Sequence, residues 1–253
     1  MTVRYLGSTC AAVQLDSAGP NSSKTAVSSI RPVGPAMLRC RKSFVSALVT
    51  EPKCLTVPSV GQLSFFSAES VPPAVTDLSG LLAGTGQVVT ANSAARVSVV
   101  VAQSWRARAI AGFVEECGLA AEIVQSQEGH PLVRTETVLD LAPLASQWTK
   151  GAVKSVPHGW VPGPRELRIW ALADGYGEND GERFVLGLDP HAPETHTPLS
   201  LALIRAGIAP TLIGTRGASP GLRITGRRRL TRLAENIGSP PAAADPDLGW
   251  PRF

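Results

Sequence analysis

Hydrophobic and polar positions have no sustained period over residues 1–70, and they follow regular periods after that. The early segment is rich in Ser, Pro, Thr and Val, and no helical or strand period lasts there beyond about six residues. We therefore expect residues 1–70 to be a disordered leader, with the folded part beginning near Gln62–Val71. The Arg- and Ser-rich, acid-poor composition of residues 1–50 also resembles an organellar transit peptide, and a misplaced start codon is a third interpretation.

From residue 72 onward the pattern predicts one series of elements that occurs twice. In the first series we expect a helix over Pro73–Ala83, a strand over Val97–Val101, a helix over Trp105–Cys117, strands over Glu122–Val124 and Leu132–Thr135, and a helix over Leu139–Trp148. In the second we expect the same order over Pro164–Ala173, Phe184–Leu188, Leu199–Ala206, Thr211–Ile213, Leu222–Thr225 and Arg228–Ile237. A proline in the first turn and a glycine after the last turn delimit the opening helix of each series.

A constant offset of 89 residues relates the two series. It aligns proline with proline, glycine with glycine and leucine with leucine: Pro73 with Pro162, Gly86 with Gly175, Gly118 with Gly207, Arg134 with Arg223, and Leu141 with Leu230. The blocks CGLAAEIV (117–124) and AGIAPTLI (206–213) match in pattern throughout. We interpret residues 71–150 and 151–240 as two repeats of one unit, followed by a tail over 241–253.

Composition narrows the class of protein. The chain of 253 residues is 43% hydrophobic and 17% charged, which is typical of a globular protein. No run of eighteen apolar residues exists, so we expect a cytoplasmic protein without a membrane partner. The four cysteines have no CxxC or metal-finger spacing, which argues against a disulfide scaffold and a structural zinc site.

The net charge of +4 is too small to indicate a nucleic-acid-binding protein, but its distribution is uneven. The segment from residue 216 to residue 232 contains no acidic residue and six arginines: Arg216, Arg223, Arg227, Arg228, Arg229 and Arg232. Three adjacent arginines at the start of a predicted helix oppose the helix dipole, so they are not there to stabilise the helix. This local basic stripe is a candidate nucleic-acid-binding feature.

The repeated order of elements resembles the LAGLIDADG homing endonuclease family. The residues that carry the resemblance are LRIWALADG at Leu167–Gly175 and, more weakly, LSGLLAGTG at Leu78–Gly86. Lys154 and Pro157 also match the Lys-x-x-Pro that precedes the second motif in single-chain members of the family. The resemblance covers about 170 residues and implies an α+β fold with two pseudo-symmetric αββαββα halves.

In that family the two motif helices pack against each other at a pseudo-twofold axis. Small residues allow this approach, and the sequence supplies them as Gly80, Ala83 and Gly84 on one helix and Ala171 and Ala173 on the other. Trp170 departs from the pattern, so it would have to point into the core of its own half. The resemblance further implies a monomer with internal pseudo-twofold symmetry.

The resemblance also implies that one acidic residue at the end of each helix holds a divalent metal over the scissile phosphates. Asp174 matches that position, and Mg²⁺ would be the metal. The 89-residue offset places Thr85 where the other acid should be, so a symmetric double-strand cut is not expected. Lys154 would be the catalytic cation that contacts phosphate, and the alternative is an ordinary surface lysine.

The strands of this fold lie in the DNA major groove, which implies double-stranded DNA as the partner. Arg223 on the last strand of the second repeat and Arg216 in the turn before it would contact phosphates or guanine edges. We assign Arg227, Arg228 and Arg229 to the same nucleic-acid contact.

Two further groups have simpler interpretations. His191 and His196, with Asp189 and Glu194, contain metal-ligand types, but the three prolines of DPHAPETHTP indicate a loop between a strand and a helix. Trp148, Trp160 and Trp170 are expected to pack in the core or at a hinge rather than to stack on bases.

Three classes of function follow from the sequence. The first is a catalytically degenerate nucleic-acid-binding protein, because Thr85 replaces the first acid. The second is an active Mg²⁺-dependent endonuclease or nickase that uses Asp174 and Lys154. The third is a non-enzymatic adaptor or interaction module that has kept only the fold.

Overall fold

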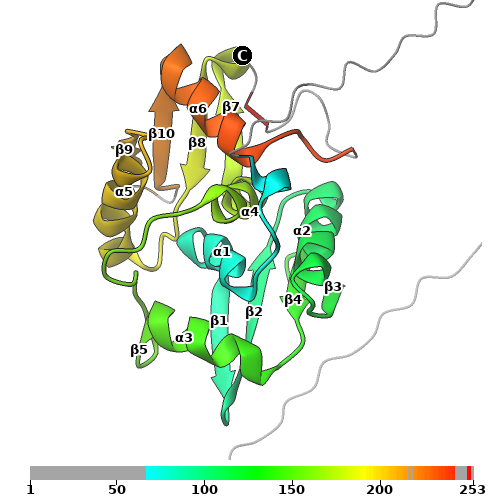
Figure 1. Cartoon of the computed structure of the whole chain (residues 1–253). Helices are drawn as coiled ribbons and strands as arrows, with labels where there is room; N and C mark the ends of the chain where they lie inside the picture. Colours follow the sequence, from blue (N-terminus) through cyan, green and yellow to red (C-terminus); the bar gives the residue numbers. More distant parts are fainter. Residues whose placement is uncertain (1–66, 216, 218, 243–249, 252–253) are drawn as a thin grey trace, which may run out of the picture. The chain divides into compact units, whose positions relative to one another are not determined.

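The computed structural model describes residues 67–215, 217, 219–242 and 250–251 (Figure 1). Residues 1–66 of the expected leader, and Arg216, lie outside the described residues. Ser67 and Ala68 are buried, so the fold includes at least residue 67. None of the helices in this described part is long and apolar enough to span a bilayer.

The first half contains three α-helices, four strands and two short 3-10 helices. In chain order these are the 3-10 helix Val75–Leu78, α1 Ser79–Ala83, β1 Gln87–Ala91, β2 Ala94–Val100, α2 Ser104–Glu116, β3 Ala121–Gln125, β4 Pro131–Thr135, the 3-10 helix Leu139–Leu141 and α3 Ala142–Trp148. A short hairpin of β5 Thr149–Lys150 and β6 Val153–Lys154 leads toward the second half.

The second half has the same order of α-helices and strands. It contains α4 Pro164–Asp174, β7 Gly175–Glu178, β8 Arg183–Gly187, α5 His196–Arg205, β9 Thr211–Ile213, β10 Gly221–Thr225 and α6 Arg227–Ile237. The two four-stranded antiparallel sheets also agree in strand order, β1-β2-β4-β3 and β7-β8-β10-β9. The expected α+β class and the αββαββα succession are therefore confirmed.

Two expectations about local structure need correction. The helix expected over Pro73–Ala83 begins at Val75 as a 3-10 helix and becomes α-helical only at Ser79. Strands β1 and β7 had not been located in the sequence, because β1 buries no residue fully and β7 is only four residues long, two of them glycines. The hairpin of β5 and β6 was not expected either, and the remaining strands and α-helices lie within a few residues of their expected bounds.

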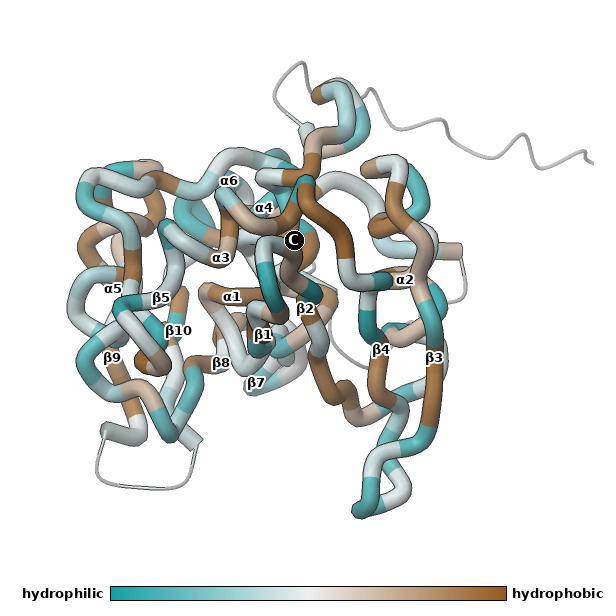
Figure 2. Tube along the Cα trace, turned by 90° about the horizontal axis from the view of Figure 1, so that it is seen from below, coloured by the Kyte–Doolittle hydropathy of each residue, from teal (hydrophilic) through white to brown (hydrophobic). Residues whose placement is uncertain are grey.

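Each sheet has one face against the helices and one face outward (Figure 2). In β2 the alternation is plain, since Val97 and Val99 are buried whereas Arg96 is exposed. In β10, Leu222 and Ile224 are fully buried and join the hydrophobic core with the apolar side of the helices. Polar side chains of both sheets are therefore presented on the face opposite the helices.

The central contact is between α1 and α4. A Cβ atom at Gly80 would meet the backbone carbonyl of Glu166 and lie 2.5 Å from Cγ2 of Ile169, so only glycine permits this approach. Trp170 is fully buried, and its indole N–H donates to the carbonyl of Gly187 at 2.9 Å, so it points into its own half as expected. The crossing brings the C-terminal ends of α1 and α4 together.

Candidate functional site

Thr85 and Asp174 meet where α1 and α4 end. The backbone N–H of Thr85 donates to Oδ2 of Asp174 at 2.9 Å, and the Thr85 hydroxyl donates to Oδ1 at 2.7 Å. Gly84 is required beside them, because a Cβ atom there would collide with the Asp174 carboxylate. Both carboxylate oxygens of Asp174 are thus engaged by the residue that occupies the corresponding position of the first half.

Lys154 reaches the same place from the end of β6. Its ammonium donates to the carbonyls of Gly84 at 2.5 Å and Gly86 at 2.8 Å, and it pairs with Oδ2 of Asp189 at 3.2 Å. An ammonium has three protons, and three oxygens surround this one. Burial lowers the pKa of Lys154, and the nearby Asp189 carboxylate opposes that shift. Lys154 acts here as an internal clamp between the halves.

Asp189 is the second buried carboxylate of the site. It also accepts the side-chain amide N–H of Gln87 at 2.8 Å and the backbone N–H of His191 at 2.9 Å. The His196 ring bonds the backbone oxygen of Asp189 at 2.8 Å. In the described part of the chain, no three His, Cys, Asp or Glu side chains are grouped as metal ligands. These residues stabilise a loop, in agreement with the simpler interpretation of their sequence.

Arg106 is a residue of this site that the sequence analysis missed. From α2 of the first half, its guanidinium donates to the carbonyls of Ala171 at 3.0 Å, Leu172 at 2.7 Å and Gly175 at 2.6 Å. These are carbonyls at the C-terminal end of α4, where a helix leaves its acceptors unpaired. Burial lowers the pKa of Arg106, and the attraction of Asp174 opposes that shift. Its sequence signal is an arginine on the apolar side of a helix, next to Trp105.

The charges of the site balance. Arg106 and Lys154 are the two cations, and Asp174 and Asp189 are the two carboxylates. Burial raises the pKa of Asp174, and the hydrogen bonds from Thr85 oppose that shift. A Mg²⁺ ion here would compete for carboxylate oxygens that the protein already uses. Those of Asp174 and Asp189 are bonded to protein donors, and Thr85 adds no charge.

The predicted nucleic-acid contacts lie in two places. Arg223 is on the outward face of β10 and forms an ion pair with Glu178 of β7 at 2.8 Å. Arg134 has the corresponding position in the first sheet, where it pairs with Glu122 of β3 at 2.8 Å. Arg96 and Arg183 point to the same outward faces, as the strand pairing shows. Each outward face therefore carries two arginines and one glutamate on its strands.

Arg227, Arg228 and Arg229 do not share the outward face with Arg223. They are exposed in the first turn of α6. Leu230, Leu233 and Ile237 of that helix are buried in the core on the other side of the sheet. The stripe seen in the sequence is thus divided between a strand face and the adjoining start of a helix.

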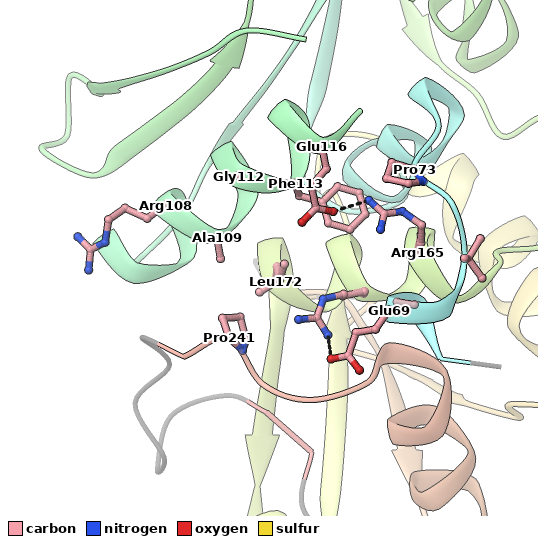
Figure 3. Close-up of a pocket in the computed structure, with 13 residues that line it drawn as sticks. Glu69, Pro73, Arg108, Ala109, Gly112, Phe113, Glu116, Arg165, Leu172 and Pro241 are labelled. Atoms are coloured by element: carbon pink, nitrogen blue, oxygen red, sulfur yellow. Dashed lines mark hydrogen bonds and ion pairs between the residues drawn. The ribbon is translucent and has the colours of Figure 1, made fainter. Parts of the chain in front are cut away.

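A hollow of about 500 Å³ between α2, α4 and the segments before α1 and after α6 contains further buried charge (Figure 3). Arg165 pairs with Asp77 at 2.6 Å and with Glu116 at 2.9 Å, and its guanidinium lies over the Phe113 ring. Arg168 donates to the carbonyl of Ser239 and pairs with Glu69 at 3.6 Å. Since these arginines are bonded within the protein, the hollow is a structural junction between chain segments.

Comparison with known proteins gives similarity at the level of solved structures. No family model matches the sequence, and none of the curated proteins matches it. The full-length DUF199/WhiA protein from Thermatoga maritima is 16% identical with a TM-score of 0.48, and the match covers 64% of this chain and 54% of that one. The chain thus spans about half the length of that protein.

Two other solved structures are similar to a comparable degree. The homing endonuclease I-WcaI, solved bound to its DNA recognition sequence, is 12% identical with a TM-score of 0.48. The match covers 71% of this chain and 88% of that one. The N-terminal LAGLIDADG domain of DUF199/WhiA is 15% identical with a TM-score of 0.46, and the match covers 65% of this chain and 82% of that one. Two series of helix, strand pair, helix, strand pair and helix, with one strand order in both sheets, give this chain a LAGLIDADG endonuclease-like α+β fold.

Proposed function

We propose that this protein binds duplex DNA through the outward faces of its two sheets and leaves both strands intact. The observation that carries the proposal is the matched placement of Arg134 and Arg223 on those faces, each with a second arginine nearby. Strand pairs fit the DNA major groove, and arginine contacts phosphates and guanine edges. When DNA binds, its phosphates would replace Glu122 and Glu178 as the partners of the Arg134 and Arg223 guanidinium groups.

The central site supports binding without cleavage. Hydrolysis by two metals requires carboxylates that are free to hold the ions. Thr85 supplies a hydroxyl where a second carboxylate would be needed, and it bonds both oxygens of Asp174. Lys154 directs its ammonium to protein oxygens and so has no proton left for a phosphate.

The start of α6 would extend the contact. Arg227, Arg228 and Arg229 are exposed and follow β10 after a single residue. We propose that they contact phosphates that flank the region under the sheets, together with Arg216. The affinity they add would depend on salt and would not depend on sequence.

A titration of labelled duplex DNA over a series of salt concentrations tests the proposal. We expect the logarithm of the association constant to fall linearly with the logarithm of salt, by about 0.9 for each phosphate neutralised. Arg134→Ala with Arg223→Ala should weaken binding more than Arg108→Ala with Arg205→Ala, a control that removes two exposed arginines from α2 and α5. Replacing Arg227, Arg228 and Arg229 together by alanine should make the association constant fall less steeply with salt, because fewer phosphates are neutralised.

The same samples, incubated with Mg²⁺ or Mn²⁺, test whether the DNA stays intact. If one DNA strand is cut by the wild type and is not cut by Asp174→Asn, the protein is a nickase and the proposal is wrong. Failure to bind DNA at low salt would overturn it and leave the adaptor module.

A further inference from the structure

A groove of about 570 Å³ lies between the linker that joins the two halves and the outer side of α5. It is separate from the central site and from the arginines on the outward sheet faces. Its walls come from the end of α3, β5, the linker before α4, and α5 (Figure 1). The residues that line it are Gln147, Lys150, Ser155, Val156, Pro157, His158, Gly159, Trp160, Pro198, Leu201 and Arg205.

The floor of the groove is apolar and held in place by the core. Trp160 packs edge to face on Trp148, with 5.0 Å between ring centroids, and Trp148 is 1% exposed. Leu201 projects from α5 with 47% of its surface exposed, beside Val156 and the two prolines. An aromatic residue and an exposed leucine in one hollow are typical of a site that receives an apolar side chain.

The rim of the groove carries positive charge. Lys150 and Arg205 are the two cations that line it, His158 also lines it, and all three are exposed. None of the described residues that line it is Asp or Glu. A partner with carboxylates around an apolar anchor would complement both properties. The proline, valine and leucine side chains that line the groove favour a peptide over nucleic-acid bases, which stack on aromatic faces.

We propose that this groove binds an acidic peptide segment of a partner protein, with one apolar side chain inserted between Trp160 and Leu201. The carboxylates on either side of that anchor pair with Lys150 and Arg205. The site is independent of DNA binding, because none of its residues lies on the strands that present Arg134 and Arg223.

Fluorescence anisotropy with labelled peptides tests the proposal on the full chain. The probe is EEDFLDEE, and the controls are KKRFLRKK, which reverses the charge, and EEDSSDEE, which lacks the apolar anchor. We expect saturable binding of the probe alone. Leu201→Asp should weaken it by about tenfold or more. Lys150→Glu with Arg205→Glu should abolish it and favour the basic peptide.

Ile204→Asp is the matched control. Ile204 is on the same helix and is 49% exposed, but it does not line the groove, so this variant should bind as the wild type does. Equal losses in both variants would overturn the proposal, as would no binding of the probe at about 1 mM. Displacement of the probe by single-stranded oligonucleotide would assign the groove to nucleic acid. Self-association that Leu201→Asp abolishes would assign it to a second copy of this chain.

Discussion

The backbone N–H and the hydroxyl of Thr85 donate to the two carboxylate oxygens of Asp174, a residue 89 positions further along the chain. The separation equals the offset that aligns the two halves in the sequence, so residues in corresponding positions bond to each other. The uncharged threonine hydroxyl donates a hydrogen bond to the charged aspartate carboxylate, so the two side chains attract each other. Two aspartates at this distance would repel each other unless a cation lay between them.

Thr85→Asp should therefore destabilise the protein and make it respond to divalent cations. The new carboxylate would face Asp174 and could not donate a proton to it as the Thr85 hydroxyl does. With a chelator present to remove divalent ions, the variant should therefore have a lower melting temperature than the wild type. Mg²⁺ or Mn²⁺ should restore it by binding between the two acids. Thermal melts with and without each ion measure this effect. Thr85→Asn is the control of similar size, and it should show no response to the ions; an equal response would refute the explanation.

The stability of the protein should depend on the ionisation of Asp174. Its pKa is raised in the folded state by burial, so the folded protein binds a proton more readily than the unfolded chain. The stability that this proton confers is complete below the unfolded-state pKa and is lost as the pH rises through the folded-state pKa. Asp174→Asn should remove that loss, so the variant should gain stability over the wild type as the pH rises above about 4. Melting temperatures of both proteins from acidic to neutral pH test it; a widening advantage of the wild type would contradict it.

Gly80 should not tolerate a methyl group. Gly80→Ala would place a Cβ atom against Glu166 and Ile169 of α4. Overpacking of this kind costs about 1–3 kcal/mol in the free energy of unfolding. Gly112→Ala is the matched control in α2, because a Cβ atom there meets nothing within 4 Å. It should stabilise the helix by about 0.5–1 kcal/mol. Denaturant unfolding of the two variants should give shifts of opposite sign.

Removal of the Arg165 side chain should leave a buried negative charge. The side chains of Arg165 and Asp77 are 6% and 7% exposed and lie 2.6 Å apart. Breaking such a pair on one side costs about 3–5 kcal/mol, so Arg165→Met should unfold at much lower denaturant. Adding Asp77→Asn should recover part of the loss, because the amide is uncharged and can still accept the Ala74 N–H. Additive losses in the double variant would exclude this account.

The sequence predicts most helices and strands because their periods are strong. Strand β9 occurs at its expected bounds, and α4 extends one residue beyond them, since Pro164 marks its start and Gly175 its end. Strand β1 escapes prediction because its register is set by pairing with β2, and four of its five side chains are exposed. Hydrogen bonds between backbones do not depend on side-chain type, so a strand held mainly by them has no hydrophobic pattern in the sequence.

The sequence identifies the members of the central site better than their roles. The offset aligned Thr85 with Asp174 and the Lys-x-x-Pro match located Lys154, but their partners depend on the tertiary fold. Gly84 and Gly86 bind Lys154 through backbone carbonyls, which side-chain identity does not reveal. Arg106 acts on α4 from a distance of more than sixty residues, so no local pattern contains it.

The bonds of Arg106 to α4 have a consequence for the order in which the protein folds during synthesis. Synthesis runs from the N-terminus, so early segments are available for contacts before later ones. Arg106 on α2 is synthesised before α4, so the carbonyls of Ala171, Leu172 and Gly175 already have their donor in the chain when they are made. A circularly permuted chain that began at the second half would have to wait, with the end of its central helix unpaired, until α2 was made.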